Sequence, residues 1–289
     1  MGVKRAAVIW RAIAIFSGWL ALAGCAEAPA PIQRLALLAP FEGRYREIGY
    51  NALYAARLAW QDFGSLTVEL LPLDDGGTPA SAAERARGLA QDPLVKVVIA
   101  LGYDAASQDV QLALAGIPLV VVGNWNAQPV SGSTFVLANP SLSAQLSTPA
   151  NLPVTAAPQL LPPIVGGDVL ALRQFRRLAT RQTDGFTILS SARLPDREFS
   201  ARYRASGLYV PPSGLLDSLT YDAAGMSLQA MQTPDTAGRL RAMSYTGLNG
   251  IIRFQNGYWA DAPIHRYRYD SACLQRSGDE LCLVSAEDT

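Results

Sequence analysis

Few residues in this chain have the chemistry of a catalytic site. His265 is the only histidine and lies in the alternating segment "IHRYRY", where a lone histidine is more typical of a structural residue than of a catalytic base. Ser190, Ser191 and Asp184 could supply other members of a hydrolase triad, but the Gly-x-Ser-x-Gly turn that exposes a nucleophile is absent from the sequence. We therefore predict that the protein is not an enzyme.

Patterns that hold metals or cofactors are also incomplete. Asp74 and Asp75 precede two glycines, but the Asp-x-Asp spacing of a calcium loop is missing, so they are interpreted as turn formers at a strand end. No glycine-rich phosphate loop occurs, which argues against a nucleotide cofactor. With one histidine and few cysteines, a zinc site is not expected either. We expect no metal and no cofactor.

Cys273 and Cys282 flank "LQRSGDEL", whose central Ser-Gly is typical of a hairpin turn. In an oxidising compartment this pair is predicted to form a local disulfide, with two free thiols as the alternative. The prediction therefore depends on where the protein resides.

The N-terminal residues address that question. Lys4, Arg5 and Arg11 accompany an apolar run at 12–23, which is shorter than the roughly 20 residues of a membrane-spanning helix. A basic start, a short apolar middle and small residues at its end are typical of a secretory signal.

The signal ends in "LAGC", which resembles a bacterial lipobox, in which the cysteine is lipidated. The alternatives are an uncleaved anchor helix or an ordinary signal peptide with a chance cysteine. We predict a lipoprotein signal peptide at 1–24, lipidation of Cys25 and a tether at 25–33. The protein would be exported and held on the extracytoplasmic side of a membrane by its lipid anchor.

Charge bears on the partners. The chain has 24 basic and 24 acidic residues, and the leader contains three of the basic ones and none of the acidic ones. The mature chain is therefore slightly acidic, which argues against nucleic acid as a partner.

Strands and helices alternate along the first half of the mature chain. The apolar segments at 34–40, 66–73, 95–102 and 117–123 read as buried strands. Helices are expected between them, at 45–62, from Pro79 to Ala90 after a Thr78 cap, and at 105–115. This order predicts an α/β fold with a doubly wound parallel sheet, whose ligands bind beyond the carboxyl ends of the strands.

The loops expected at those carboxyl ends contain the candidate ligand-binding residues. Asp104 is placed to cap the helix after the third strand, and Ser107 lies in its first turn, where free N–H groups suit a carboxylate. Aromatic side chains nearby could form flat walls for an apolar group. The alternative is that Asp104 is only a cap and the aromatics pack against neighbouring loops. The predicted ligand contacts are Tyr45, Tyr103, Asp104, Ala105, Ser107, Asn124 and Trp125.

Several segments resemble one family. They are "LALLAPFEGRYREIGYNALYAARLA", "LLPLDDGGTPASAAERARGLAQDPLVKVVIALGYDAAS" and "AGIPLVVVG", followed later by "SLTYDAAGMSLQAM" and "GLNGIIRFQNGYW". In order and spacing they are similar to type I periplasmic binding proteins, the branched-chain amino-acid receptors of ABC importers.

The resemblance implies a clamshell of two lobes between which the chain crosses three times. Lobe one would comprise 34–123 and 195–245, and lobe two 134–191 and 247–285. In the family, loops after the third and fourth strands hold the carboxylate and ammonium of an amino acid. The implied function is a solute-binding lipoprotein that delivers an amino acid or similar small molecule to ABC permease subunits.

The chain departs from the family pattern in lobe two. The segment 138–165 contains six prolines and no charged residue, which indicates a Pro-rich linker and a reduced second lobe. One helix and one strand are expected in "GGDVLALRQFRRLATRQTDGFTILSS". An alternative function follows: a reduced relative that no longer transports and acts as a surface sensing or interaction lipoprotein.

Overall fold

The computed structural model describes residues 31–147, 164–175, 186–270, 273 and 282–286. The chain divides into two compact units, Met1–Ile32 and Gln33–Thr289. The elements given below all lie in the second unit. The predicted signal peptide, Cys25 and most of the tether lie outside the described residues.

The larger of two main sheets has seven strands in the order β10-β11-β5-β4-β3-β1-β2. Its parallel part is formed by β1 (Gln33–Ala39), β2 (Val68–Asp74), β3 (Val95–Leu101), β4 (Leu119–Val122) and β5 (Thr134–Val136). Beyond β5 lie β11 (Tyr258–Trp259), parallel to β5, and the edge strand β10 (Phe254–Gln255), antiparallel to β11. The doubly wound parallel sheet expected from the sequence is confirmed.

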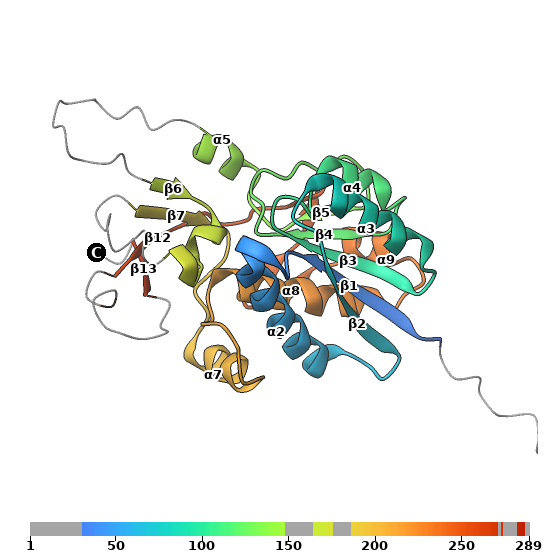
Figure 1. Cartoon of the computed structure of the whole chain (residues 1–289), viewed down its shortest axis with the longest axis horizontal. Helices are drawn as coiled ribbons and strands as arrows, with labels where there is room; N and C mark the ends of the chain where they lie inside the picture. Colours follow the sequence, from blue (N-terminus) through green and yellow to red (C-terminus); the bar gives the residue numbers. More distant parts are fainter. Residues whose placement is uncertain (1–30, 148–163, 176–185, 271–272, 274–281, 287–289) are drawn as a thin grey trace, which may run out of the picture. The chain divides into compact units, whose positions relative to one another are not determined.

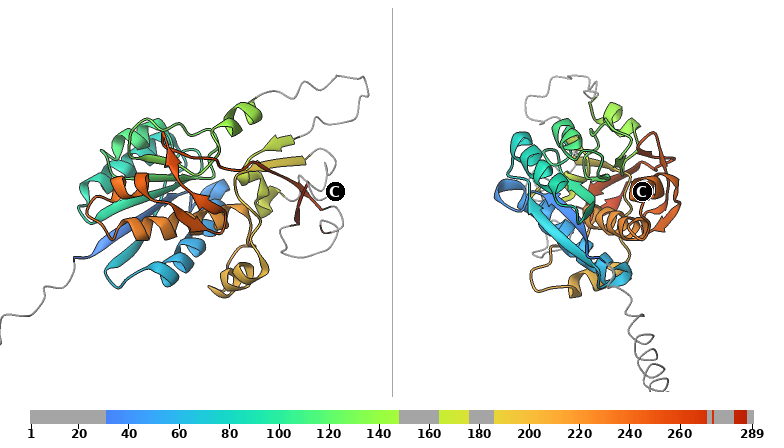
Figure 2. Two further views of the ribbon diagram at one scale, coloured as in Figure 1. Left: turned by 180° about the vertical axis from the view of Figure 1, so that it is seen from behind. Right: turned by 90° about the vertical axis from the view of Figure 1, so that its right-hand side faces the viewer.

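Helices cover both faces of this sheet (Figure 1; Figure 2 shows it from behind). Alternate residues along a strand point to opposite faces, so Leu35 and Leu37 pack with α2 (Arg46–Phe63) and α8 (Leu215–Ala230). Ala36 and Leu38 pack with α3 (Pro79–Gln91) and α4 (Gln108–Ala113). Because both faces are buried, the strands read as continuous apolar runs.

The second sheet has four strands in the order β13-β12-β7-β6. Strands β6 (Ile164–Gly166) and β7 (Phe186–Ser190) are parallel, whereas β12 (His265–Tyr269) and β13 (Leu283–Ser285) are antiparallel to their neighbours. In the described part of the chain, two 3₁₀ helices follow β6, namely η2 (Asp168–Ala171) and η3 (Arg173–Phe175). The sequence predicts one helix in this segment, and residues 176–185 of it lie outside the described part.

The remaining elements complete the larger unit. They are three helices, η1 (Gly43–Tyr45), α7 (Arg197–Ala205) and α9 (Thr236–Ala242), and a short antiparallel hairpin of β8 (Tyr245–Gly247) and β9 (Gly250–Ile252). Asp222 of α8 fixes this hairpin, since its carboxylate accepts the N–H groups of Leu248 and Asn249 at 2.8 and 2.9 Å.

Sheet membership corrects two boundaries expected from the sequence. Strand β5 and strands β10–β11 were assigned to lobe two, but they pair into the seven-stranded sheet. The segment 138–165 also contains a helix, α5 (Ser141–Ser147), and the start of β6; residues 148–163 lie outside the described part. Short elements of this kind give too few residues for periodicity to show.

The structure confirms one helix start predicted from the sequence and contradicts another. Thr78 caps α3 as expected, because its hydroxyl accepts the Ser81 N–H at 3.2 Å and Pro79 opens the helix. Helix α4 is shorter than expected and begins after Ser107, so the prediction that Asp104 caps it is wrong. An acidic or hydroxyl residue can cap at several neighbouring positions, and sequence alone does not choose among them.

Cys273 and Cys282 are paired in the structure, with Cα atoms 5.4 Å apart, a separation typical of disulfides. In the parts of the chain that the structure describes, no helix is both long and apolar enough to span a membrane.

Candidate functional site

A cleft of about 760 Å³ lies at the carboxyl ends of β1, β2, β3 and β4. This is where ligands bind in open parallel sheets, and its volume is in the range of small-molecule sites. The loops that follow these four strands form one face of the cleft, which we call the strand-end face. The other face, which we call the cover face, is formed by β6, η2 and η3.

Asp74 organises the strand-end face. One carboxylate oxygen accepts the N–H groups of Phe41 and Glu42 at 2.7 and 3.0 Å, and the other accepts the Gly76 N–H at 2.9 Å. The carboxylate therefore joins the loop after β1 to the turn after β2. The interpretation of Asp74 as a turn former covers only part of this role.

Asp75 lines the cleft although its residue is only 2% exposed. Its Oδ1 accepts the Gly77 N–H at 2.8 Å. Burial raises the pKa of Asp75, the bond from Gly77 offsets part of that rise, and the charges of Asp74 and Asp104 add to it. Asp75 was interpreted only as a turn former; its position directly after a predicted strand was the signal that could have placed it here.

Aromatic rings form the walls of the strand-end face. Tyr103 and Trp125 meet edge to face, with centroids 6.4 Å apart and planes at 87°, a favourable geometry for ring pairs. The guanidinium carbon of Arg44 lies 5.9 Å from the centroid of the Tyr45 ring. Tyr45 and Tyr103 are 45% and 49% exposed, so both rings have area free to contact a ligand.

The cover face is largely apolar. It contributes Val165, Gly166, Gly167, Val169, Leu170 and Phe175. Gly167 packs against the indole of Trp125 so closely that an added Cβ would collide with the ring. The absence of a side chain at 167 thus lets the two faces approach each other.

The predicted ligand contacts fall into two groups. Tyr45, Tyr103, Asp104 and Trp125 line the cleft, together with Asp75, whereas Ala105, Ser107 and Asn124 do not. Ala105 is fully buried. The Asn124 amide is used within the protein, since it donates to the Gly102 carbonyl at 3.4 Å and accepts the Asn126 N–H at 3.0 Å.

Comparison with known proteins identifies the architecture. No protein-family model matches the chain, and no curated protein matches it. Among solved structures, the benzoate complex of an R. palustris ABC-transporter solute-binding protein is 15% identical, with a TM-score of 0.62 over 88% of this chain and 95% of that one. The Streptococcus pneumoniae branched-chain amino acid binding protein LivJ with isoleucine is 14% identical, with a TM-score of 0.62 over 88% and 99%. The chain has the type I periplasmic binding protein fold.

A third structure shows the range of ligands found on this fold. A fatty acid ABC transporter substrate-binding protein from Thermomonospora curvata is 11% identical, with a TM-score of 0.62 over 89% of this chain and 91% of that one. Among these proteins of the same fold, two were solved in complex with benzoate or isoleucine, and the third is named for fatty acid transport. The fold alone does not specify the solute.

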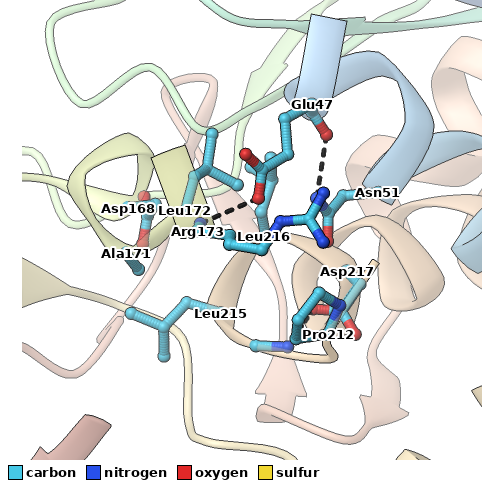
Figure 3. A pocket seen from close by; sticks show the side chains of 11 residues that line it. Glu47, Asn51, Asp168, Ala171, Leu172, Arg173, Pro212, Leu215, Leu216 and Asp217 are labelled. Atoms are coloured by element: carbon cyan, nitrogen blue, oxygen red, sulfur yellow. Dashed lines mark hydrogen bonds between the residues drawn. The ribbon is translucent and has the colours of Figure 1, made fainter. Parts of the chain in front are cut away.

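The two faces are connected at a small cavity of about 10 Å³ (Figure 3). Glu47 of α2 projects toward η3, where its two carboxylate oxygens accept the N–H groups of Arg173 and Gln174 at 2.8 and 3.0 Å. We call this region, with Asp168 and Asp217 beside it, the joint. Charged acceptors make strong hydrogen bonds to free N–H groups at a helix start. Glu47 therefore connects α2 to η3, which is part of the cover face.

Two further carboxyl groups of the joint are buried. Burial raises the pKa of Asp168 to about 6, which the hydroxyl of Ser190 partly offsets by donating to it. Burial raises the pKa of Asp217 to about 8, although the Gly214 N–H donates to its Oδ1 at 2.5 Å. Its Oδ2 is buried without a hydrogen-bond partner among the described residues.

Of the residues considered for catalysis, Ser190 and Ser191 are buried. Strand pairing sets His265 opposite Ser190, but Ser190 is 0% exposed and its hydroxyl is bonded to Asp168. Asp184 lies outside the described residues. Among the residues that are described, no group of three or more His, Cys, Asp or Glu side chains could hold a metal ion.

Proposed function

We propose that this protein is an exported solute-binding lipoprotein of an ABC importer, which captures an amino acid or a similar small molecule. The observation that carries the proposal is the cleft, which combines aromatic and charged groups on the strand-end face with an apolar cover face. Solute-binding proteins that share its fold support the role. Permease subunits would be its protein partners.

In this proposal the two sheets belong to two lobes that close on the ligand. The chain passes between the sheets three times, after β5, after β7 and after β11. Hinge segments of this kind allow closure, which the ligand favours by contacting both faces. The sequence-based lobes 34–123 with 195–245, and 134–191 with 247–285, are retained apart from the strands reassigned above.

The ligand-binding test is calorimetry or a thermal-shift screen of the full chain against amino acids, aromatic acids and small amines. We expect at least one compound to raise the unfolding temperature, because a ligand that binds only the folded state stabilises it. Trp125→Ala should abolish that response while leaving the unliganded protein folded. A folded protein that responds to no compound would contradict solute binding.

The anchoring part of the proposal concerns Cys25. We expect a fatty-acid analogue fed to the producing bacterium to label the wild-type chain but not Cys25→Ala, because the lipobox cysteine would carry the acyl groups. Equal labelling of both chains would contradict a lipid anchor at this residue. Cys282→Ser serves as a matched control that removes a different cysteine.

The non-transporting alternative has one observation in its favour. Among the described residues, the second sheet contains a single parallel pair, β6 and β7, and two antiparallel strands. A small cover face contacts less of the ligand surface, so ligand binding stabilises the closed state of the two lobes less. Absence of any bound solute, together with retention of the lipid anchor, would favour this alternative.

A further inference from the structure

The charged groups of the cleft are unequal in sign. Glu42, Asp75 and Asp104 line it as carboxylates, whereas Arg44 is the cationic lining residue among those described. Arg44 is exposed and its guanidinium lies over the Tyr45 ring. The cleft therefore provides more stabilisation for a cation than for an anion.

Asp75 is the most constrained of these carboxylates. Only 2% of the surface of Asp75 is exposed, yet the residue forms part of the cleft wall. Its Oδ1 is bonded to Gly77, and no described residue donates a hydrogen bond to Oδ2. A buried carboxylate without a cationic partner is unfavourable, and a ligand cation within the cleft would supply that partner.

For an anionic group, the lining offers Arg44, which is exposed to solvent and already lies over the Tyr45 ring. The carboxylate site expected from the sequence was the start of the helix after β3, but α4 has only six residues. Ser107, which was to provide the hydroxyl, does not line the cleft. A ligand carboxylate would share the cleft with Glu42, Asp75 and Asp104, and the repulsion between like charges would weaken its binding.

The rings suit a cation with an apolar body. Tyr45, Tyr103 and Trp125 surround the same cleft as the carboxylates, and aromatic faces attract ammonium groups. Val169, Leu170 and Phe175 of the cover face offer apolar surface but no charge. The polar and apolar halves of a ligand would thus contact different faces.

We propose that the cleft selects a compact organic amine, with one cationic nitrogen placed at Asp75 and Asp104, an apolar body on the cover face and no carboxylate. The inference rests on the proposed function, because it assigns a ligand class to the same cleft. It replaces the zwitterion or carboxylate expected from the sequence.

Three probes with the same ring separate the alternatives: 2-phenylethylamine, phenylalanine and 3-phenylpropionate. Each is titrated calorimetrically into the full chain, purified in mild detergent. The amine should bind, phenylalanine should bind about tenfold more weakly or worse because its carboxylate meets the acidic face, and 3-phenylpropionate should not bind.

Asp75→Asn tests the cationic contact. The Asn carbonyl still accepts the Gly77 N–H, so the turn is retained while the charge is lost. Affinity for 2-phenylethylamine should fall about 10- to 100-fold, the range for a hydrogen bond to a charged group. The matched control is Asp109→Asn, which removes the same charge from an exposed position outside the cleft lining and should leave affinity unchanged.

The ring contact is tested by a pair of variants at Tyr103. Tyr103→Phe keeps the aromatic face and should preserve amine affinity, whereas Tyr103→Leu removes the face and should weaken it severalfold. Unfolding temperatures of all variants are measured without ligand, so that loss of binding is not confused with loss of folding.

The outcomes distinguish this inference from the function on which it rests. If phenylalanine binds and the amine does not, solute binding stands and amine selection is overturned. Binding of 3-phenylpropionate also overturns it, as does an Asp75→Asn chain that binds the amine as tightly as wild type. If a folded chain binds none of the three probes, amine selection is overturned while solute binding is judged by the wider screen.

Discussion

On the strand-end face, the cleft is bounded by loops that contain three carboxylates and three aromatic rings; on the cover face, it is bounded by glycine, aliphatic and phenylalanine residues. The strand-end loops are held by hydrogen bonds within that face: the Asp74 carboxylate accepts N–H groups of the loop after β1, and the Asn124 amide donates to the Gly102 carbonyl. The cover face is tied to the opposite side by Glu47.

This difference indicates a division of roles. In the proposed function, the groups of the strand-end face would discriminate one ligand from another, since polar groups held in place confer specificity. The cover face would supply apolar area to the ligand and exclude water from it. The joint connects the two faces and contains the buried carboxyl groups of Asp168 and Asp217. We therefore expect the free energy of unfolding to depend on pH mainly through these groups.

The largest expected effect concerns Asp217 in the joint. Its pKa is raised from 3.8 to about 8 in the folded protein, so the folded state binds a proton that the unfolded state has released. The contribution of this group to the free energy of unfolding is therefore greatest below about pH 4 and is lost as pH rises toward 8. Asp217→Asn should remove this loss, and its stability relative to wild type should grow with pH to several kcal/mol near pH 8, at about 1.4 kcal/mol per pKa unit.

Denaturant unfolding of both chains between pH 4 and pH 8 provides the measurement. Asp168 and Glu47 face the same cavity, and Asp168, with its pKa raised to about 6, adds a dependence of the same sign that remains in the variant. Asp261→Asn, at a side chain that is 86% exposed, is the control. A constant difference between Asp217→Asn and wild type across this pH range would refute the assignment.

The next largest effect concerns the disulfide, and it should affect the second sheet and not the first. Replacing both Cys273 and Cys282 by serine should lower the free energy of unfolding by about 2–3 kcal/mol, because the bridge closes a short loop in the unfolded chain. The loss should be localised: amide exchange should quicken in β12 and β13 but not in β1 to β4. Two freely alkylated thiols in the wild-type protein, isolated without reductant, would show that the bridge does not form.

The sequence was most informative where elements are long and buried. Strands β1, β3 and β4 are apolar on both faces, and the Thr78-Pro79 start of α3 combines two independent signals. The same reasoning placed Tyr45, Tyr103 and Trp125 near the carboxyl ends of the strands, and the structure places them in one cleft.

The cover face was not predictable in the same way. Strand β6 has three residues and the two 3₁₀ helices are short, so none contains a full period of either pattern. Gly167 owes its role to Trp125, a contact between segments far apart in sequence. Asp75 has the turn-forming chemistry that the sequence suggested, but its burial depends on packing that no local pattern records.

A smaller effect tests the link between the faces. Glu47→Gln leaves one carbonyl oxygen where two carboxylate oxygens accept the N–H groups of Arg173 and Gln174. The free energy of unfolding should fall by about 1–2 kcal/mol, because charge-assisted bonds are replaced by a single neutral one. Amide exchange should quicken at these two residues in particular.

Glu69→Gln is the matched control for this prediction. Glu69 is paired with Arg34 on the surface, where the two side chains are 50% and 33% exposed, and exposed pairs contribute less than about 1 kcal/mol. Unchanged exchange at Arg173 and Gln174 in Glu47→Gln would mean that the cover side is held by other contacts.

The smallest effect is expected at Ser107, and it decides which groups of the strand-end side contact the ligand. Ser107 precedes α4 without a side-chain capping bond, and its Oγ is buried with no hydrogen-bond partner among the described residues. Ser107→Ala should therefore change the free energy of unfolding by no more than about 0.5 kcal/mol and ligand affinity by no more than about twofold, because the residue does not line the cleft. Thr78→Ala is the comparison, since that cap does accept a hydrogen bond and its loss should cost about 1 kcal/mol. A loss of affinity of about tenfold or more in Ser107→Ala would place Ser107 in direct contact with the ligand, as expected from the sequence.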